Sequence, residues 1–346
     1  MAPSTQKAVV VQADGSVVIT SVPVPKPGPG QILVKVAAVA QNPVDFKTIA
    51  WVKKEGAIVG CDYAGTVEEI GPDVPAGLRT IGERVAGFVF GSYYKNGSCA
   101  QYVLAEAAPT VHLPENWSFE DGSQLGVGPF TAAQLLWEAQ QLPTPIQPAT
   151  APFPLLISGG ASSVGQFAIQ FAKLSGLQVF ATASPKHFDL VKSLGADEVF
   201  DYHDPEVAKK IKAATGGKLK HAVDAISENG TPAIVAAALS DEGGVISVTL
   251  PYPETRAGVT AIPICAYNML GKSYDFPFQW EATEEAKALG KRFAEHISKV
   301  ISLNRLKPNP KVVYPSGLAS VQQGLLDGPK ISGQKIIFRI ADTPDL

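Results

Sequence analysis

The segment from residue 154 to residue 184 constrains the fold of this chain more than any other part of its sequence. Apolar runs at residues 155–158 and 179–183 have the pattern of strands that are buried on both faces. Between them lie a glycine-rich turn, residues 159–165, and apolar residues at helical spacing. A strand, a glycine turn, a helix and a second strand in this order are typical of a dinucleotide-binding unit.

The glycine turn is where such a unit binds phosphate. Gly159 and Gly160 allow the turn to close, and Gly165 allows the helix to approach the strand. Backbone N–H groups at the helix start would then hold a pyrophosphate. The predicted contacts come from Gly160, Ala161, Ser162, Ser163 and Val164. The alternative is a tight turn in another kind of α/β protein.

The residues that follow this unit favour the dinucleotide-binding interpretation, because they continue the alternation. Helices are predicted at residues 185–194, 205–215 and 232–239, and strands at residues 198–202, 221–226 and 244–250. Strands that alternate with helices at this spacing form a parallel sheet with helices on both faces. The middle of the chain is therefore predicted to be a doubly wound α/β domain.

The first 115 residues or so are mostly β in pattern, with frequent Gly and Pro turns. Strands are predicted at residues 7–11, 17–20, 32–40, 59–71 and 97–104, with another after the turn at 82–85. Asn42 and Pro43 resemble a helix cap followed by a first-turn proline, so Asp45 and Lys47 should lie on a short helix.

The remaining segments suggest that the α/β domain is inserted into a β domain built from both ends of the chain. A helix is predicted after a glycine-rich start at residues 121–140, followed by a proline-dense connector at 142–154. Residues 252–279 look irregular and aromatic, residues 284–303 helical, and residues 335–340 form a last strand.

Composition excludes several classes of function. The formal net charge of −3 gives no reason to expect nucleic acid or an anionic membrane as a partner. The three cysteines have no paired spacing, which fits a reducing compartment and offers no disulfide framework. We see neither an apolar run of ~20 residues nor a secretion signal. A cytoplasmic protein is expected.

Motifs along nearly the whole chain resemble those of the medium-chain dehydrogenase/reductase superfamily: NPVDFK at 42–47, GCDYAG at 60–65, GERV at 82–85 and the glycine turn. SPKHFDL at 184–190, EVFDY at 198–202 and ISGQK at 331–335 are similar to fungal trans-acting enoyl reductases that serve polyketide synthases. The resemblance implies a GroES-like domain (1–122 and 273–346) and a Rossmann domain (123–272), with the cofactor in the cleft between them.

Alcohol dehydrogenases of this superfamily hold zinc, and the resemblance places their ligand positions at Asn42 and the Cys61–Asp62 pair. A tetrahedral catalytic site needs at least three protein ligands. No second cysteine or histidine stands near a matching position, so we predict no metal and expect Cys61 to be a small core residue.

The cofactor is predicted to be NADPH. Preference for NAD needs an acidic residue at the end of the second strand. Residues 183–186, Ala-Ser-Pro-Lys, offer a hydroxyl and an ammonium instead, which suit a 2′-phosphate. The resemblance implies phosphate contacts from Ser184, Lys186, His187 and Tyr202. The alternative is that Ser184 caps the next helix and that Lys186 is merely solvated; for Ser184 the two roles are compatible.

The resemblance implies hydride transfer to the β-carbon of an α,β-unsaturated carbonyl and protonation at the α-carbon. Negative charge then develops on the carbonyl oxygen, where a donor or cation is stabilising. The catalytic candidates are Lys47, Tyr63 and Thr131. Their alternatives are a surface lysine, a wall residue and a helix-start cap, and Asp45 would orient Lys47 or cap a backbone group. No hydrolytic triad is recognisable.

Further positions are carried over by the resemblance. Those expected at the cofactor are Val44, Asp45, Lys47, Thr249, Leu250, Ser332 and Gly333. Those expected at the substrate are Thr131, Tyr267, Asn268, Met269 and Leu270. The predicted function is a zinc-independent, NADPH-dependent enoyl reductase for an acyl thioester, with a polyketide synthase as partner and a monomer or homodimer as its state. The alternatives are a quinone or alkenal reductase and a non-enzymatic NADPH-binding protein.

Overall fold

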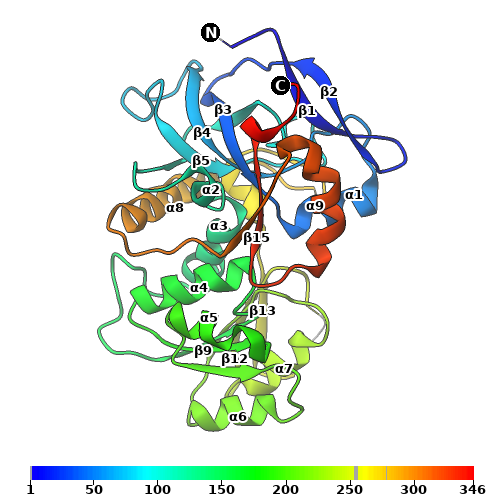
Figure 1. The fold of residues 1–346 in the computed structure, drawn as a ribbon. Coiled ribbons are helices and arrows are strands. Elements are labelled where there is room, and N and C mark those ends of the chain that lie inside the picture. The colour runs from blue at the N-terminus through cyan, green and yellow to red at the C-terminus, as the bar shows by residue number, and fades with distance from the viewer. Residues whose placement is uncertain (1, 253–255, 278) are drawn as a thin grey trace. The chain divides into compact units, whose positions relative to one another are not determined.

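The computed structural model describes residues 2–252, 256–277 and 279–346. The chain divides into two compact units (Figure 1). Unit 1 comprises Met1–Val127, Tyr267–Asn304 and Pro308–Leu346, and unit 2 comprises Gly128–Ala266 and Arg305–Lys307. The domain limits given above, after residue 122 and before residue 273, stay a prediction.

Unit 2 contains a parallel sheet of six strands in the order β10-β9-β8-β11-β12-β13. The strands are β8 (Pro154–Ser158), β9 (Gln178–Ala183), β10 (Glu198–Asp201), β11 (His221–Asp224), β12 (Gly244–Val248) and β13 (Val259–Pro263). The chain leaves β8 toward β9 and returns on its other side at β11. The order therefore reverses between β8 and β11, which is where open α/β sheets bind ligands.

Helices connect these strands and confirm the predicted doubly wound sheet. They are α4 (Ser163–Leu174), α5 (Phe188–Ser193), α6 (Val207–Ala214) and α7 (Thr231–Ala238). α4 packs on β8 and β9, and α7 packs on β8 and β11. The core between α6, α7 and the sheet contains the fully buried side chains of Leu156, Phe180 and Ile246. Each helix thus buries an apolar face against strands whose own runs are apolar.

The prediction of an irregular segment at residues 252–279 was wrong for β13, which pairs with β12 from Gly244↔Val259 to Val248↔Pro263. β13 is an edge strand and is only partly buried, so its sequence lacks a strong apolar run. Pro263 is tolerated because an edge strand leaves one side unpaired. Residues 253–255 and 278 of the predicted segment lie outside the described residues.

Unit 1 is built around a sheet in the order β14-β15-β3-β4-β5-β7, with β6 also paired to β3. Its strands are β3 (Gln31–Ala40), β4 (Asp62–Ile70), β5 (Arg84–Phe88), β6 (Tyr102–Glu106), β7 (Val111–His112), β14 (Lys311–Tyr314) and β15 (Lys335–Arg339). A separate hairpin joins β1 (Thr5–Val11) and β2 (Val17–Pro23). β3 pairs with β6 along residues 31–35 and with β15 along residues 38–40, so both ends of the chain meet in one sheet.

The helices of unit 1 partly follow the prediction. α1 (Pro43–Val52) and α8 (Glu284–Ser302) form where expected, whereas α9 (Val321–Asp327) and β14 were not predicted. The helix predicted at residues 121–140 is interrupted: α2 (Phe119–Gly122) ends before α3 (Val127–Ala133), which continues as a π-helix (Gln134–Glu138). Gly122, Gly126 and Gly128 fall in or beside the interruption, where glycine disfavours helix.

The strand predicted at residues 97–104 was also displaced, because β6 begins only at Tyr102. A Cβ atom on Gly97 would lie 2.1 Å from the carbonyl oxygen of Ile58, so the backbone here makes a close approach instead of pairing in a regular strand. Among the described residues, no helix combines the length and the apolar character needed to cross a membrane.

Candidate functional site

The glycine turn of unit 2 requires its glycines. Gly159 has φ +76°, and a Cβ atom on Gly165 would lie 2.2 Å from the carbonyl oxygen of Gly159. Ser162 caps α4, because its hydroxyl accepts a hydrogen bond of 3.0 Å from the N–H of Gly165. The turn directly follows β8, beside the reversal in strand order. The N-terminus of α4 therefore presents backbone N–H groups and the positive end of the helix dipole where a phosphate would bind.

Two hydroxyl groups lie close together just after the carboxyl ends of β9 and β10. Ser184 follows β9, Tyr202 follows the adjacent β10, and their oxygens are 3.0 Å apart. Ser184 occupies the N-cap position of the next turn, but its hydroxyl makes no hydrogen bond to the backbone there. Its side chain therefore does not cap the helix, which was the alternative role considered above. β9 ends without a carboxylate. The nearby Asp201, at the end of β10, accepts hydrogen bonds from the backbone and ring of His203.

Lys186 and His187 lie on the single turn Pro185–His187 that follows Ser184. Partial burial and the neighbouring Lys186 lower the pKa of His187, so its ring is neutral near pH 7 and Lys186 supplies the positive charge. Two hydroxyls and an ammonium beside a strand end form a donor set that fits a phosphate monoester.

Asp224, at the end of β11, organises the other side of the reversal and was not predicted. Its carboxylate is buried and accepts bonds from the N–H groups of Ile226 and Ser227 and from the hydroxyls of Thr231 and Tyr252. The Ser227 hydroxyl in turn accepts a 3.0 Å bond from the N–H of Thr249. This network holds the predicted segment Thr249–Leu250 at the carboxyl end of the sheet.

One catalytic candidate, Thr131, lies in unit 2, on α3. Thr131 is buried inside the helix and not at its N-terminus, so the helix-start cap considered above does not describe it. Thr131 therefore remains a candidate for contact with a ligand, and that role stays a prediction.

In unit 1 the predicted helix cap is part of a buried polar network. The N–H of Asn42 donates a 2.8 Å bond to Asp45 Oδ2, which closes the first turn of α1. Asp45 Oδ1 accepts a 3.1 Å bond from Ser92, whose hydroxyl also accepts from the N–H of Gly60. Burial raises the pKa of Asp45 despite these bonds. Asp45 thus caps backbone groups, as one alternative proposed.

Lys335 brings a positive charge into the same network. Its ammonium donates to Asn42 Oδ1 and lies 3.7 Å from Asp62 Oδ2. The other oxygen of Asp62 accepts a 2.7 Å bond from the N–H of Val127, the first residue of α3. Burial lowers the pKa of Lys335 and raises that of Asp62 to about 6, although their mutual attraction opposes both changes. Sequence analysis missed Lys335, because an ammonium 293 residues from Asn42 gives no local signal.

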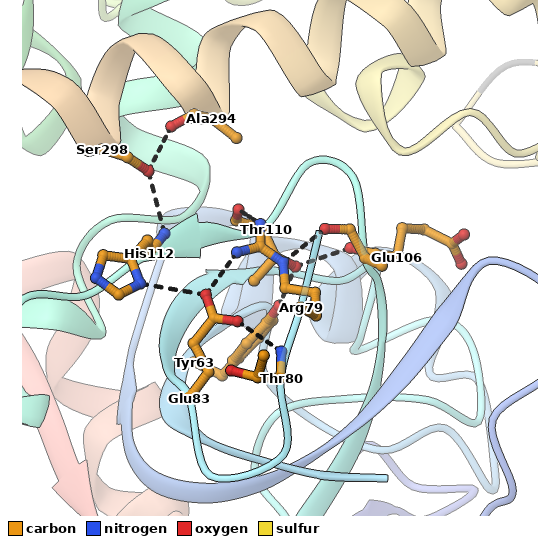
Figure 2. Close-up of polar contacts among 10 residues, drawn as sticks. Tyr63, Arg79, Thr80, Glu83, Glu106, Thr110, His112, Ala294 and Ser298 are labelled. Carbon is orange, nitrogen blue, oxygen red and sulfur yellow. Dashed lines mark hydrogen bonds and ion pairs between the residues drawn. The ribbon is translucent and has the colours of Figure 1, made fainter. Parts of the chain in front are cut away.

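Tyr63 lies in the hydrophobic core of unit 1 and is 0% exposed. Adjacent residues of a strand face opposite sides, so its ring points away from the side of β4 that carries Asp62. Its hydroxyl is 3.0 Å from Thr110 Oγ1, which itself donates to the carbonyl of Glu106 (Figure 2). Tyr63 must then donate its proton to Thr110, and burial raises its pKa far above the usual range. These contacts favour the packing alternative over an acid.

Lys47 lies on α1 and is half-buried, so it is not a fully exposed surface lysine. The substrate segment falls on the single turn Ala266–Leu270. The Tyr267 ring stacks on Phe90 at 3.8 Å between centroids, and its hydroxyl is 3.2 Å from Cys61 Sγ. Further rings extend this aromatic cluster, which sequence analysis did not assemble: Tyr93, Tyr94, Tyr274 and Phe276.

Comparisons with known proteins agree with this architecture. The alcohol dehydrogenase GroES-like domain family matches residues 28–115, and the zinc-binding dehydrogenase family matches residues 163–272. A trans-enoyl reductase of Alternaria alternata, ACTTS2, is 41% identical over 97% of this chain and 99% of its own. Two solved structures share the fold. The CurK enoyl reductase has a TM-score of 0.79 and 18% identity, and the match covers 97% of this chain and 99% of that one. A mycobacterial protein, Rv1454c, solved with NADPH, has a TM-score of 0.77 and 21% identity, and the match covers 96% of this chain and 99% of that one.

The two matched domains and the shared fold define the class: an oxidoreductase of the medium-chain dehydrogenase/reductase superfamily. Within this class the chain belongs to the trans-enoyl reductase family, because the similarity extends over essentially the full length of both chains. The family resemblance and the fold class predicted from the sequence are confirmed.

The name of the second matched family, zinc-binding dehydrogenase, raises the question whether this chain binds zinc. The residues at the expected ligand positions, Asn42 and the Cys61–Asp62 pair, do not fit a zinc ion. Asn42 Oδ1 and Asp62 Oδ2 face the Lys335 ammonium, which would repel a divalent cation. Burial raises the pKa of Cys61 well above normal, whereas a zinc ligand must be a thiolate. Among the described residues, no three His, Cys, Asp or Glu side chains are grouped to hold a metal ion.

Proposed function

We propose that this protein is an NADPH-dependent, zinc-independent enoyl reductase that acts on α,β-unsaturated acyl thioesters carried by a polyketide synthase. The observation that carries the proposal is the full-length similarity, at 41% identity, to a protein named as a trans-enoyl reductase. NADPH, when bound, supplies a hydride to the β-carbon of the substrate. The protein contributes binding, orientation and electrostatics.

NADPH is preferred over NADH because of the residues that follow β9. The N-terminus of α4 binds the pyrophosphate, while Ser184, Lys186 and Tyr202 surround the 2′-phosphate. NADH would leave the ammonium of Lys186 without its anionic partner. A carboxylate that could bind a free ribose hydroxyl is lacking at the end of β9.

In this proposal Lys47 stabilises the negative charge that develops on the thioester oxygen. Asp45, buried at the start of the same helix, fixes the helix that carries Lys47 through its bonds to Asn42 and Ser92. A cation placed before the reaction lowers the barrier without reorganisation. Thr131 and the turn with Tyr267, Asn268, Met269 and Leu270 position the acyl chain, and Val44, Ser332 and Gly333 contact the cofactor.

The test is a substrate panel. The purified protein is supplied with NADPH and with crotonyl and longer enoyl thioesters of N-acetylcysteamine, beside quinones and alkenals, and NADPH oxidation is followed. The proposal expects higher kcat/KM on the thioesters. Preference for quinones would identify a quinone reductase instead, and tight NADPH binding without any turnover would identify a non-enzymatic binding protein. Chelator treatment should leave turnover unchanged.

Lys47→Ala tests the catalytic assignment. Loss of the ammonium should lower kcat by about a hundredfold, as expected for removal of one oxyanion-stabilising group. Lys35→Ala, an exposed lysine of β3, serves as the control and should retain full turnover. Unchanged turnover of Lys47→Ala would remove Lys47 from the mechanism.

A further inference from the structure

Lys335 is the first residue of β15, a strand that is otherwise apolar and buried along Ile336, Ile337 and Phe338. Its side chain is 3% exposed, and that of its partner Asp62 is 0% exposed. A buried ion pair of this kind gains little stability, because taking both charges out of water offsets their attraction. A pair of apolar residues at positions 335 and 62 would serve the core equally well, so the two charges call for another role.

Lys335 is linked to three segments that carry proposed site residues, to two of them by contacts and to the third by the chain itself. Asn42, which accepts from the ammonium, begins α1 with Val44, Asp45 and Lys47. Asp62, 3.7 Å from the ammonium, holds the N–H of Val127 at the start of α3, the helix with Thr131. Lys335 itself follows the loop that contains Ser332 and Gly333.

The network leaves little room for adjustment. A Cβ atom on Gly126 would lie 2.3 Å from Asp62 Oδ1, so the loop before α3 is pressed against this carboxylate. Ser92, which binds Asp45, is held at φ +63°, a backbone conformation that residues other than glycine rarely adopt. The starts of α1 and α3 are therefore each fixed by more than one contact.

We propose that Lys335 is a positioning residue, whose buried ammonium holds the start of α1, the start of α3 and the 332–333 loop in the arrangement that cofactor binding and reduction require. This role rests on the proposed function. A displacement of about 1 Å in a reacting group can cost roughly a hundredfold in rate. Loss of the ammonium should therefore affect the reaction even where the fold survives.

The test uses the double variant Lys335→Met with Asp62→Asn, which removes both charges and keeps an acceptor for the N–H of Val127. Because the charge of Asp62 is removed together with that of Lys335, the unfolding midpoint of the double variant should fall less than that of Lys335→Met alone. NADPH affinity, measured by fluorescence titration, should fall about tenfold, and kcat on the crotonyl thioester should fall about a hundredfold. A purely structural role would lower the folded fraction and leave the affinity of the folded protein unchanged.

The matched control is Lys311→Met. Lys311 is the register partner of Lys335 on β14, but its side chain is 31% exposed and pairs with Asp121. This variant should keep parent values of NADPH affinity and kcat. If the double variant does not fold, Lys335→Gln retains a neutral donor toward Asn42 and should show the same tenfold loss of affinity.

Folded variants at position 335 with parent-like NADPH affinity and kcat would overturn the proposal. A parent protein that binds NADPH but reduces no enoyl thioester would refute the proposed function instead. In that case the NADPH titration of the variants still decides whether Lys335 positions the segments proposed to bind the cofactor. The two failures can therefore be distinguished.

Discussion

The glycine turn of unit 2 and the Lys335 network of unit 1 place polar groups in opposite ways. The turn uses backbone: Gly159 and Gly165 shape it, and the N-terminus of α4 presents N–H groups. The network uses side chains, with Lys335 and Asp62 nearly or fully inaccessible to solvent. Substitutions other than proline leave the backbone donors in place, whereas each side chain of the network can be removed. The first region should therefore be sensitive to added bulk and the second to altered charge.

The largest effect is expected for Gly165→Ala in the glycine turn. The added Cβ would meet the carbonyl of Gly159 at 2.2 Å, so the turn must open and its N–H groups lose their alignment. NADPH affinity should fall by at least about a hundredfold, or ~3 kcal/mol. Calorimetric titration measures it, with Gly28→Ala as the control, since its Cβ would touch only the Gln31 side chain. Unchanged affinity would show that side chains, and not this backbone, hold the cofactor.

Charge reversal outside the glycine turn should have a smaller and more selective effect. Lys186→Glu places a carboxylate beside the Ser184–Tyr202 hydroxyl pair and repels the 2′-phosphate. KM for NADPH should rise about ten- to a hundredfold, while KM for NADH should change much less. Lys218→Glu, an exposed lysine of the same unit, controls for general electrostatics. Equal effects on the two cofactors would remove Lys186 from the phosphate site.

The pH dependence of stability should separate the two regions further. Burial raises the pKa of Asp62 from 3.8 to about 6, so the folded state keeps this proton to higher pH than the unfolded state does. The contribution of Asp62 is therefore most favourable below pH 3.8 and is lost as the pH rises through about 6. The loss should be on the order of 2–3 kcal/mol, because one pKa unit corresponds to about 1.4 kcal/mol.

Denaturant unfolding of the double variant of Lys335 and Asp62, followed from pH 4 to 7, should lack this decline, because neither residue can titrate. Asp14→Asn, at an exposed turn where bonds from Ser16 lower the pKa of the carboxyl, should leave the decline in place. A decline of the same size in the double variant would assign it to another group.

The smallest effect is expected for Tyr63→Phe. The variant deletes the hydrogen bond to Thr110 and should reduce the free energy of unfolding by about 1 kcal/mol. Turnover should stay within twofold of the parent, because the hydroxyl faces the core. A fall in kcat of a hundredfold or more, measured with saturating thioester, would instead support Tyr63 as the general acid that protonates the α-carbon.

The comparison also explains what could be predicted from the sequence. The glycine turn, Ser184 and the absence of a carboxylate after β9 depend on local spacing, so the pattern alone located the turn that we propose as the cofactor site. Asp224 could have been found from its position at the end of an apolar strand. Lys335 could not, because its partners lie far away along the chain and only the pairing of β15 with β3 brings them together.

Local patterns failed where tertiary contacts decide the structure. The edge strand β13 has a weak apolar run and was assigned as irregular. The helix predicted at 121–140 breaks where Gly126 must pack against Asp62. In both places the burial supplied by a neighbouring element, which a single sequence does not reveal, overrides local propensity.

The pairing of β15 with β3 also determines when, during translation, the Lys335 network can form. Residues 42, 62 and 127 leave the ribosome long before residue 335, and all strands of unit 2 are translated in the interval. The nascent chain must hold the carboxylates of Asp45 and Asp62 without their ammonium partner while the α/β unit is being made. Lys335 closes the network only after it has been translated, so a truncated nascent chain that stops short of β15 lacks it.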